Sequence, residues 1–489
     1  MSVLPVANDK VQLTSSAGTN YQNGVLMSGA SAVYATSSPS VWSNGIYRTA
    51  DGAIYVFNAT AGMPSGFTWS NGLPFSALGA LCVSTNAVAS WSNGIPFDAN
   101  GAVVADFGMP VPALSLNFTS GTLDSRITFT RASGATYTNS SGVLQLATSN
   151  TPRFDYDPVT LSAKGLLIEE QRTNLLTYSE QFDNAAWVKG GSCVVSANSV
   201  AAPDGTLTAD TITSTGSTAS DNQAISLITF SVVSGSVFSF SVWLKATTPT
   251  TTTIRISNLG DGDGSSSIVN VTTSWQRFTV THTFTGVSTS VRAAINYQTS
   301  ATTVYAWGAQ LEAGSFATSY IPTTTAQATR AADVAVMTGT NFSSWYNQSE
   351  GTLYAEYDIN SSTTAPNNET AIATDDGTSA NRHELRRTTS GYTSIVFVAG
   401  STSYVNMADN APILAGSTTR KSSYSYKVND VAFTSNGLTV VTDTTVTLPT
   451  VTTFRIGSSI ANGPLNGHIK ALAYYNTRLS NAQLQTLTT

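Results

Sequence analysis

The chain has 489 residues, of which 41% are hydrophobic and only 10% are charged, and its formal net charge is −6. The length predicts several domains, and the hydrophobic share is sufficient for their cores. A slightly acidic chain without a cluster of Lys and Arg argues against a nucleic-acid partner. No apolar stretch approaches the ~20 residues of a membrane helix, so we expect no membrane insertion.

Ser, Thr, Gly and Asn replace the missing charges, and the strong helix formers Lys and Glu are scarce. Such a composition is typical of a rigid extracellular β-protein. Cys82 and Cys193 lie in different predicted domains and imply no disulfide framework. The first residues lack the basic and apolar pattern of an export signal. Together these features are expected for a phage structural protein that is made in the cytoplasm and released by lysis.

A short unit is repeated four times within residues 1–113, beginning at Tyr21, Trp42, Trp69 and Trp91. Each copy starts with an aromatic residue, one further residue and Asn-Gly, which favours a type I′ turn, so each predicts a β-hairpin. Isolated hairpins are marginal in water. We therefore expect trimerisation or attachment to a larger particle to complete this region, with Trp42, Trp69 and Trp91 at those contacts. The alternative is a small independent β-domain with a repetitive core.

Prolines at 110 and 112 mark a linker, after which residues 114–172 predict a β-rich connecting segment. This segment contains RASGATY at 131–137 and PRFDYDP at 152–158, and KGLLIEEQRTNLLTYSEQF follows at 164–182. Over Leu116 to Trp187 the chain resembles tailed-phage virion proteins that are grouped as head spike or fibre domains. The resemblance implies a virion fibre or spike that carries lectin-like domains.

Residues 173–335 predict an antiparallel sandwich, because stretches such as 238–245 and 275–284 alternate between apolar and polar residues. The sequence WGAQLEAG at 307–314 resembles the last strand of jelly-roll carbohydrate-binding modules. Residues 336–489 predict a second sandwich. Its last strand and short terminal helix, for which Ser480 is a suitable N-cap, resemble the concanavalin-A or laminin-G lectin fold. The predicted fold class is all-β: N-terminal hairpin repeats followed by two antiparallel jelly-roll sandwiches.

Sugar-binding sites combine an aromatic platform with hydrogen-bonding groups. The candidates for such a site are Tyr178, Trp187, Trp275, Arg382, Tyr392 and Tyr404. No cofactor is expected except for a possible Ca²⁺ ion. Its weak candidate ligands are Asp261 and Asp263 in one acidic turn and Asp375 and Asp376 in another. An ordinary turn is the favoured interpretation of both stretches.

No catalytic residue is predicted. The enzymatic alternative is a glycosidase that uses two of the carboxylates Glu356, Asp358 and Glu384. The main expectation is a non-enzymatic homotrimeric head fibre or capsid decoration protein on the outside of the virion. Its N-terminal region would bind capsid or other virion proteins, and its lectin-like domains would bind cell-surface glycans for adhesion. A tail fibre or tailspike with depolymerase activity is the alternative, and a purely structural decoration protein is the third reading.

Overall fold

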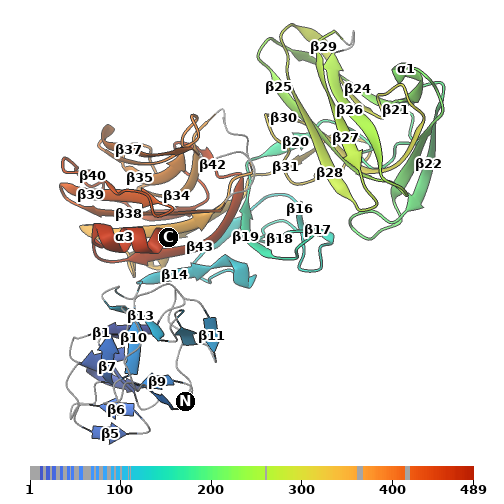
Figure 1. Cartoon of the computed structure of the whole chain (residues 1–489). Coiled ribbons are helices and arrows are strands. Elements are labelled where there is room, and N and C mark those ends of the chain that lie inside the picture. The colour runs from blue at the N-terminus through green and yellow to red at the C-terminus, as the bar shows by residue number, and fades with distance from the viewer. Residues whose placement is uncertain are drawn as a thin grey trace. The chain divides into compact units, whose positions relative to one another are not determined.

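The computed structural model describes the strand residues of the N-terminal region with 99, 102 and 110, and then residues 112–258, 262–360, 367–412 and 419–489. Strands dominate throughout, which confirms the predicted all-β class (Figure 1). The chain divides into two compact units. The N-terminal unit comprises Met1–Ser115 with Ala473–Gln483, and the C-terminal unit comprises Leu116–Leu472 with Leu484–Thr489. Among the described residues, no helix is both long and apolar enough to cross a membrane.

Each N-terminal repeat contributes three strands, one more than the hairpin that its sequence predicts. The first two strands of each repeat pair antiparallel, and the register of Ser70 with Leu73 leaves only Asn-Gly between them. The third strand then pairs antiparallel with the second. In chain order the strands are β1 (Val11–Thr14), β2 (Gly18–Gln22), β3 (Val25–Ser28), β4 (Val33–Thr36), β5 (Val41–Ser43), β6 (Ile46–Arg48), β7 (Ile54–Asn58), β8 (Thr68–Ser70), β9 (Leu73–Phe75), β10 (Leu81–Ser84), β11 (Ser90–Ser92), β12 (Ile95–Phe97) and β13 (Val103–Phe107).

The third strands of the repeats pair with one another in parallel. β4 pairs with β7, β7 with β10 and β10 with β13. β1 pairs with both β4 and β13, so these five strands form a closed ring of parallel pairs. The repeats therefore complete one another within a single chain, as in the alternative of an independent β-domain. Trp42, Trp69 and Trp91 are the middle residues of β5, β8 and β11, and their side chains lie outside the described part of the structure.

The C-terminal sandwich consists of two sheets that include strands from both sides of the jelly roll. In hydrogen-bonded order, the first sheet contains β18 (Phe154–Tyr156), β19 (Ala163–Ile168), β43 (Gly467–Tyr475), β33 (Glu350–Tyr357), β38 (Arg420–Lys427), β39 (Asp430–Ser435) and β40 (Val441–Asp443). The second contains β15 (Thr128–Thr130), β32 (Val334–Thr338), β41 (Thr453–Ile456), β34 (Glu369–Asp375), β35 (Arg382–Arg387), β36 (Tyr392–Ala399) and β37 (Thr402–Pro412), with β42 (Gly463–Pro464) beside β34. β14 (Leu114–Asn117) belongs to the first sheet as a partner of β43, and the helical elements described outside the jelly roll are η1 (Phe118–Ser120), α2 (Thr340–Ser343) and α3 (Asn481–Thr488).

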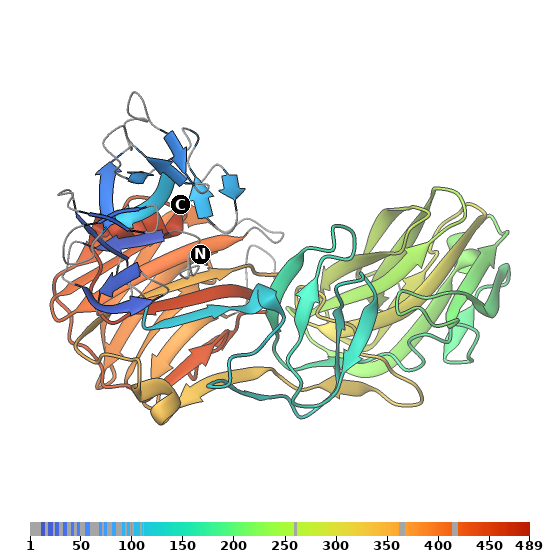
Figure 2. The same cartoon turned by 90° about the horizontal axis from the view of Figure 1, so that it is seen from below.

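Residues 114–172 are more than the connecting segment that their sequence predicts. Phe129 of β15 pairs with Ala335 of β32, and Leu166 of β19 pairs with Ile469 of β43. Figure 2 shows these turquoise residues beside the orange and red strands of the sandwich. These strands are short and can bury their apolar side chains only by joining larger sheets. The sandwich is thus discontinuous in sequence, and the jelly roll is inserted into it.

The inserted jelly roll packs two antiparallel five-stranded sheets. One contains β21 (Trp187–Lys189), β24 (Ala224–Val232), β29 (Ser288–Ile295), β26 (Thr250–Asn258) and β27 (Gly264–Val271), and helix α1 (Ala219–Asn222) precedes β24. The other contains β22 (Cys193–Val200), β23 (Ala209–Ser214), β30 (Thr302–Ala313), β25 (Val237–Lys245) and β28 (Gln276–Thr283). The chain enters through β20 (Arg172–Asn174) and leaves through β31 (Ala328–Arg330), which pair with each other (Figure 1).

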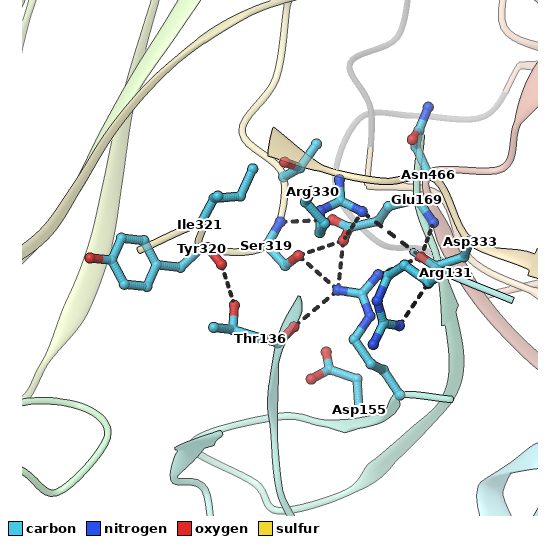
Figure 3. Close-up of polar contacts among 12 residues, drawn as sticks. Arg131, Thr136, Asp155, Glu169, Ser319, Tyr320, Ile321, Arg330, Asp333 and Asn466 are labelled. Carbon is cyan, nitrogen blue, oxygen red and sulfur yellow. Dashed lines mark hydrogen bonds and ion pairs between the residues drawn. The ribbon is translucent and has the colours of Figure 1, made fainter. Parts of the chain in front are cut away.

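A buried network of charges joins the jelly roll to the sandwich; it consists of Arg131, Arg153, Arg330, Glu169 and Asp333, and we call it the junction network (Figure 3). Arg153 contacts both carboxylates, and Arg131 binds Asp333 at 3.0 Å. Burial alone would raise the pKa of Glu169, but Arg330 and Arg153 outweigh it and hold the pKa well below its usual range. Arg131, Arg153 and Glu169 belong to the segment that carries the family resemblance, so those residues have a structural role here.

Candidate functional site

Strand β35 places charged side chains on the side of its sheet that faces away from the sandwich core, the outer face. His383 and Leu385 point into the core, where the His383 ring stacks on Phe397 at 4.8 Å. Because side chains alternate along a strand, Arg382, Glu384 and Arg386 point outward. With Asp375 and Arg455 they form a set that we call the outer-face cluster.

Glu384 is the centre of the outer-face cluster, and its carboxylate is fully buried by its own partners. Arg382 Nε donates to Oε1 at 2.8 Å, and Ser459 Oγ binds the same oxygen. Asn462 Nδ2 donates to Oε2 at 2.6 Å, and Arg386 lies 3.8 Å from that oxygen. The loop between β41 and β42 supplies Ser459 and Asn462, so this loop and the strand hold the carboxylate together.

Asp375 and Arg455 form the second pair of the cluster. Arg455 binds both carboxylate oxygens, through Nε at 2.5 Å and through Nη2 at 3.2 Å. The Asp375 side chain is buried, whereas that of Arg455 is 21% exposed. The cluster therefore combines two locked carboxylates with three partly accessible guanidinium groups.

Arg386 is held more loosely than the other cluster arginines. Besides Glu384, its contacts are Ser394 Oγ at 3.4 Å and Asn406 Oδ1 at 3.5 Å. Burial lowers the pKa of Arg386, and Glu384 offsets this only in part. A guanidinium with long contacts is available to a hydroxyl, carboxylate or sulfate of a ligand.

Three of the predicted sugar-binding residues share this outer face. Arg382 belongs to the cluster, and the alternation along β36 and β37 places Tyr392 and Tyr404 on the same side. Tyr404 is 37% exposed, so its ring is accessible on this side. The structure thus brings together an aromatic ring, guanidinium groups and amides, the groups that bind sugar rings.

The three candidates in the jelly roll do not form a site. Trp187 is fully buried and packs edge-on against Phe182 at 4.8 Å, so its prediction as a sugar platform is wrong. Tyr178 packs against the same core, and its carbonyl accepts the Trp187 indole N–H at 3.0 Å. Trp275 is half-buried and donates to the carbonyl of Ala201 at 2.9 Å.

The acidic turns are explained by hydrogen bonds within the protein. Asp263 binds His282 Nε2 at 3.0 Å and accepts the backbone N–H of Thr285 at 2.9 Å, while Asp261 lies outside the described residues. Asp376 accepts the backbone N–H of Thr378 and the amide of Asn381, and Asp375 binds Arg455. No group of three or more His, Cys, Asp or Glu side chains suited to a metal occurs in the described stretches.

The carboxylates considered for glycoside hydrolysis have separate surroundings. Glu356 lies on β33 beside the Tyr354 hydroxyl, and Asp358 follows β33 and binds His468 Nδ1 at 2.7 Å. Glu384 lies on β35 in the other sheet. A pair of carboxylates flanking one glycosidic bond would have to come from a single face.

Acid is expected to destabilise the sandwich through His383. This residue lies between the hydroxyls of Tyr346 and Tyr424, at 2.8 and 2.7 Å, and burial lowers its pKa to about 3. The folded state therefore resists protonation that the unfolded chain accepts below pH 6.5. The contribution of His383 to the free energy of unfolding should therefore be constant above that pH and fall by about 2 kcal/mol by pH 5. Urea denaturation at pH 7.5 and pH 5 measures this loss in the free energy of unfolding. The His383→Gln variant should lose much less stability between the two pH values than the wild type. An equal loss in both proteins would contradict this assignment.

Sequence reasoning missed most of the outer-face cluster. The predicted site residues did not include Arg386, Arg455 and the two loop residues Ser459 and Asn462. The spacing of Arg382, Glu384 and Arg386 at every second residue of a strand was the available signal. The partners from the loop are 75 and 78 residues from Glu384 in sequence, and only the fold brings them near.

No protein-family model and no curated protein sequence matches the chain. Among solved structures, it is similar to the CBM40 module of the Ruminococcus gnavus IT-sialidase bound to alpha2,6 sialyllactose, with 15% identity, a TM-score of 0.26 and coverage of 29% of this chain and 85% of that one. It is also similar to domain 4 of AbnA, a GH43 extracellular arabinanase from Geobacillus stearothermophilus, in complex with arabinotriose, with 15% identity, a TM-score of 0.28 and coverage of 35% and 82%. A Trypanosoma rangeli sialidase matches at 16% identity and a TM-score of 0.25, over 32% of this chain and 25% of that chain. The resemblance to phage head spike proteins stays a prediction.

Proposed function

We propose that the chain is a non-enzymatic phage virion protein, a head fibre or capsid decoration, whose C-terminal sandwich binds glycans through the outer-face cluster. The cluster carries the proposal, because it presents guanidinium groups, amides and the Tyr404 ring on one partly accessible sheet face. Three arginines face two carboxylates there, so acidic glycans should bind better than neutral ones.

Binding fits this face better than hydrolysis does. A general acid or a nucleophile needs a carboxylate that is free to exchange a proton or to attack the sugar. Glu384 already accepts hydrogen bonds from Arg382, Ser459 and Asn462, and Asp375 is occupied by Arg455. Both carboxylates therefore serve to orient the arginines that would contact the ligand.

Removing the loosely held guanidinium tests the glycan site. Arg386→Gln should weaken binding to acidic glycans at least tenfold, since a hydrogen bond to a charged group contributes about 1.5–3 kcal/mol. Tyr404→Ala should weaken the binding of acidic and neutral glycans alike. The measurement is a glycan array with the full chain, followed by calorimetry on the best ligand.

Arg126→Gln provides the matched control. Arg126 is a partly exposed arginine whose ion-pair partner, Asp124, is not part of the outer-face cluster. Its substitution should leave glycan binding unchanged. Unchanged binding in Arg386→Gln and Tyr404→Ala would reject the outer-face cluster as the site. Release of reducing ends from a bound polysaccharide, lost in Glu384→Gln, would instead favour the depolymerase alternative.

Mounting on the head is proposed from the family resemblance of residues 116–187 and is tested separately. Cryo-electron microscopy of intact virions should show the protein on the capsid shell, in three copies per fibre, with residues 1–113 against capsid protein. Density at the tail tip would support the tail-fibre alternative. A particle without this protein would reject both.

A further inference from the structure

A polar pocket lies in the C-terminal unit, where the inserted jelly roll meets the sandwich; we call it the junction pocket. Its volume is about 180 Å³. This is room for about six water molecules, and it is smaller than the roughly 300 Å³ at which pockets for drug-sized ligands begin. The junction pocket thus has room for about one sugar ring. It shares no residue with the outer-face cluster.

Three parts of the chain build the junction pocket. Strands β16 (Ala135–Thr138) and β17 (Leu144–Ala147) form a hairpin on one side, with β18 and β19 beside it. The jelly roll contributes Trp243, Arg277 and residues 317–320, and the sandwich contributes Asn360 and His468. The hairpin is tied to the jelly roll by Thr136, whose hydroxyl donates to the carbonyl of Tyr320 at 2.7 Å (Figure 3).

The carboxylates that line the junction pocket are already occupied. Asp155 accepts the backbone N–H of Thr138 at 2.6 Å and binds His468 Nε2 at 3.0 Å. Glu169 belongs to the junction network and binds Arg153, Arg330 and Ser319. Both carboxylates thus already have direct partners within the protein.

The pocket is also lined by two other cations, Arg277 and Lys164. Arg277 lies over the Trp243 ring, 4.4 Å from its centroid, and donates to the Thr318 carbonyl and the Ser241 hydroxyl. Lys164 reaches into the pocket from β19. Within the described stretches, neither Arg277 nor Lys164 is in an ion pair. Burial lowers the pKa of Arg277, and the more distant carboxylates of Glu312 and Glu169 offset this only in part, so both cations can accept an anionic ligand.

Hydroxyl and amide groups complete the pocket wall. The side chains of Tyr137, Thr138 and Asn360 line it and have no hydrogen-bond partner among the described residues. Such groups bind the hydroxyls of a sugar, while the lysine and the stacked arginine bind an anion. From this combination we infer that the junction pocket is a binding site for a single sugar acid, a monosaccharide that carries one carboxylate.

The test uses glucuronate and galacturonate as probes, with glucose and galactose as neutral controls, and measures binding to the full chain by calorimetry. The uronates should bind and the neutral sugars should bind at least tenfold more weakly. Lys164→Gln should weaken uronate binding about tenfold, because it removes a charged hydrogen-bond donor. Asn360→Ala, which keeps the backbone bond of residue 360, should weaken it severalfold. Thermal unfolding of both variants at the wild-type midpoint shows that they are folded.

Arg386→Gln separates this site from the outer-face cluster. Uronate binding that persists in Arg386→Gln and is weakened in Lys164→Gln supports the junction pocket, whether or not the outer face binds glycans. Uronate binding that is lost in Arg386→Gln and unchanged in Lys164→Gln places the sugar acid on the outer face and overturns the inference. Equal binding of neutral sugars, or no saturable uronate binding, overturns it as well.

Discussion

Asp333→Ala is expected to destabilise the C-terminal unit by about 3–5 kcal/mol, the usual result of removing one partner from a buried ion pair. The Asp333 side chain is completely buried, and its oxygens bind Arg131, Arg153 and the backbone N–H of Glu169. Without it, three arginines would share the single carboxylate of Glu169. Urea denaturation monitored by tryptophan fluorescence measures the change.

Two further variants make this result specific. Asp333→Asn keeps the size of the side chain and removes its charge, so it should cost nearly as much as the alanine variant. Asp183→Ala removes an exposed carboxylate and should change stability by less than about 0.5 kcal/mol. A loss below about 1 kcal/mol in Asp333→Ala would show that the junction network does not hold the unit together.

Gly165→Ala is expected to cost about 3 kcal/mol or more, or to prevent folding. Gly165 lies in β19 with a φ of +101°, and an added Cβ would lie 2.3 Å from the carbonyl oxygen of Ile469. Strand β43 would have to move away from β19, which would break the pairing that closes the discontinuous sandwich. Expression yield and the denaturation midpoint measure this loss.

Gly205→Ala is the matched control for this substitution. Gly205 also has a positive φ, +84°, but an added Cβ would meet nothing within 4 Å. Its substitution should cost only the backbone strain, about 1–2 kcal/mol. Equal losses in the two variants would show that strain alone, and not the contact with β43, determines the effect of Gly165→Ala.

Alternation predicted the strands of the sandwiches well, because each strand there has one face in a core. The stretch 238–245 corresponds to β25, and Ser480 caps α3 by accepting the backbone N–H of Gln483.

Long-range pairing could not be predicted from the sequence. The short strands of residues 114–172 alternate like any others, and nothing in them indicates partners that follow the jelly roll. The same limit applies to the candidate sites. Arg382, Tyr392 and Tyr404 are near one another because adjacent strands carry them, whereas Trp187 was misassigned because an apolar aromatic ring suits a core and a sugar platform equally well.

The insertion of the jelly roll has a consequence for folding. His468 meets Asp155 across 313 residues, and contacts of such range form slowly because the entropy of closing the loop must be overcome first. Among the described residues, the jelly-roll strands pair only with one another, so this domain can form as soon as its own residues leave the ribosome. Once formed, it holds β20 and β31 together and shortens the loop that the sandwich must close. The folded jelly roll should therefore speed the folding of the sandwich, and its unfolding should slow the refolding of the sandwich around it.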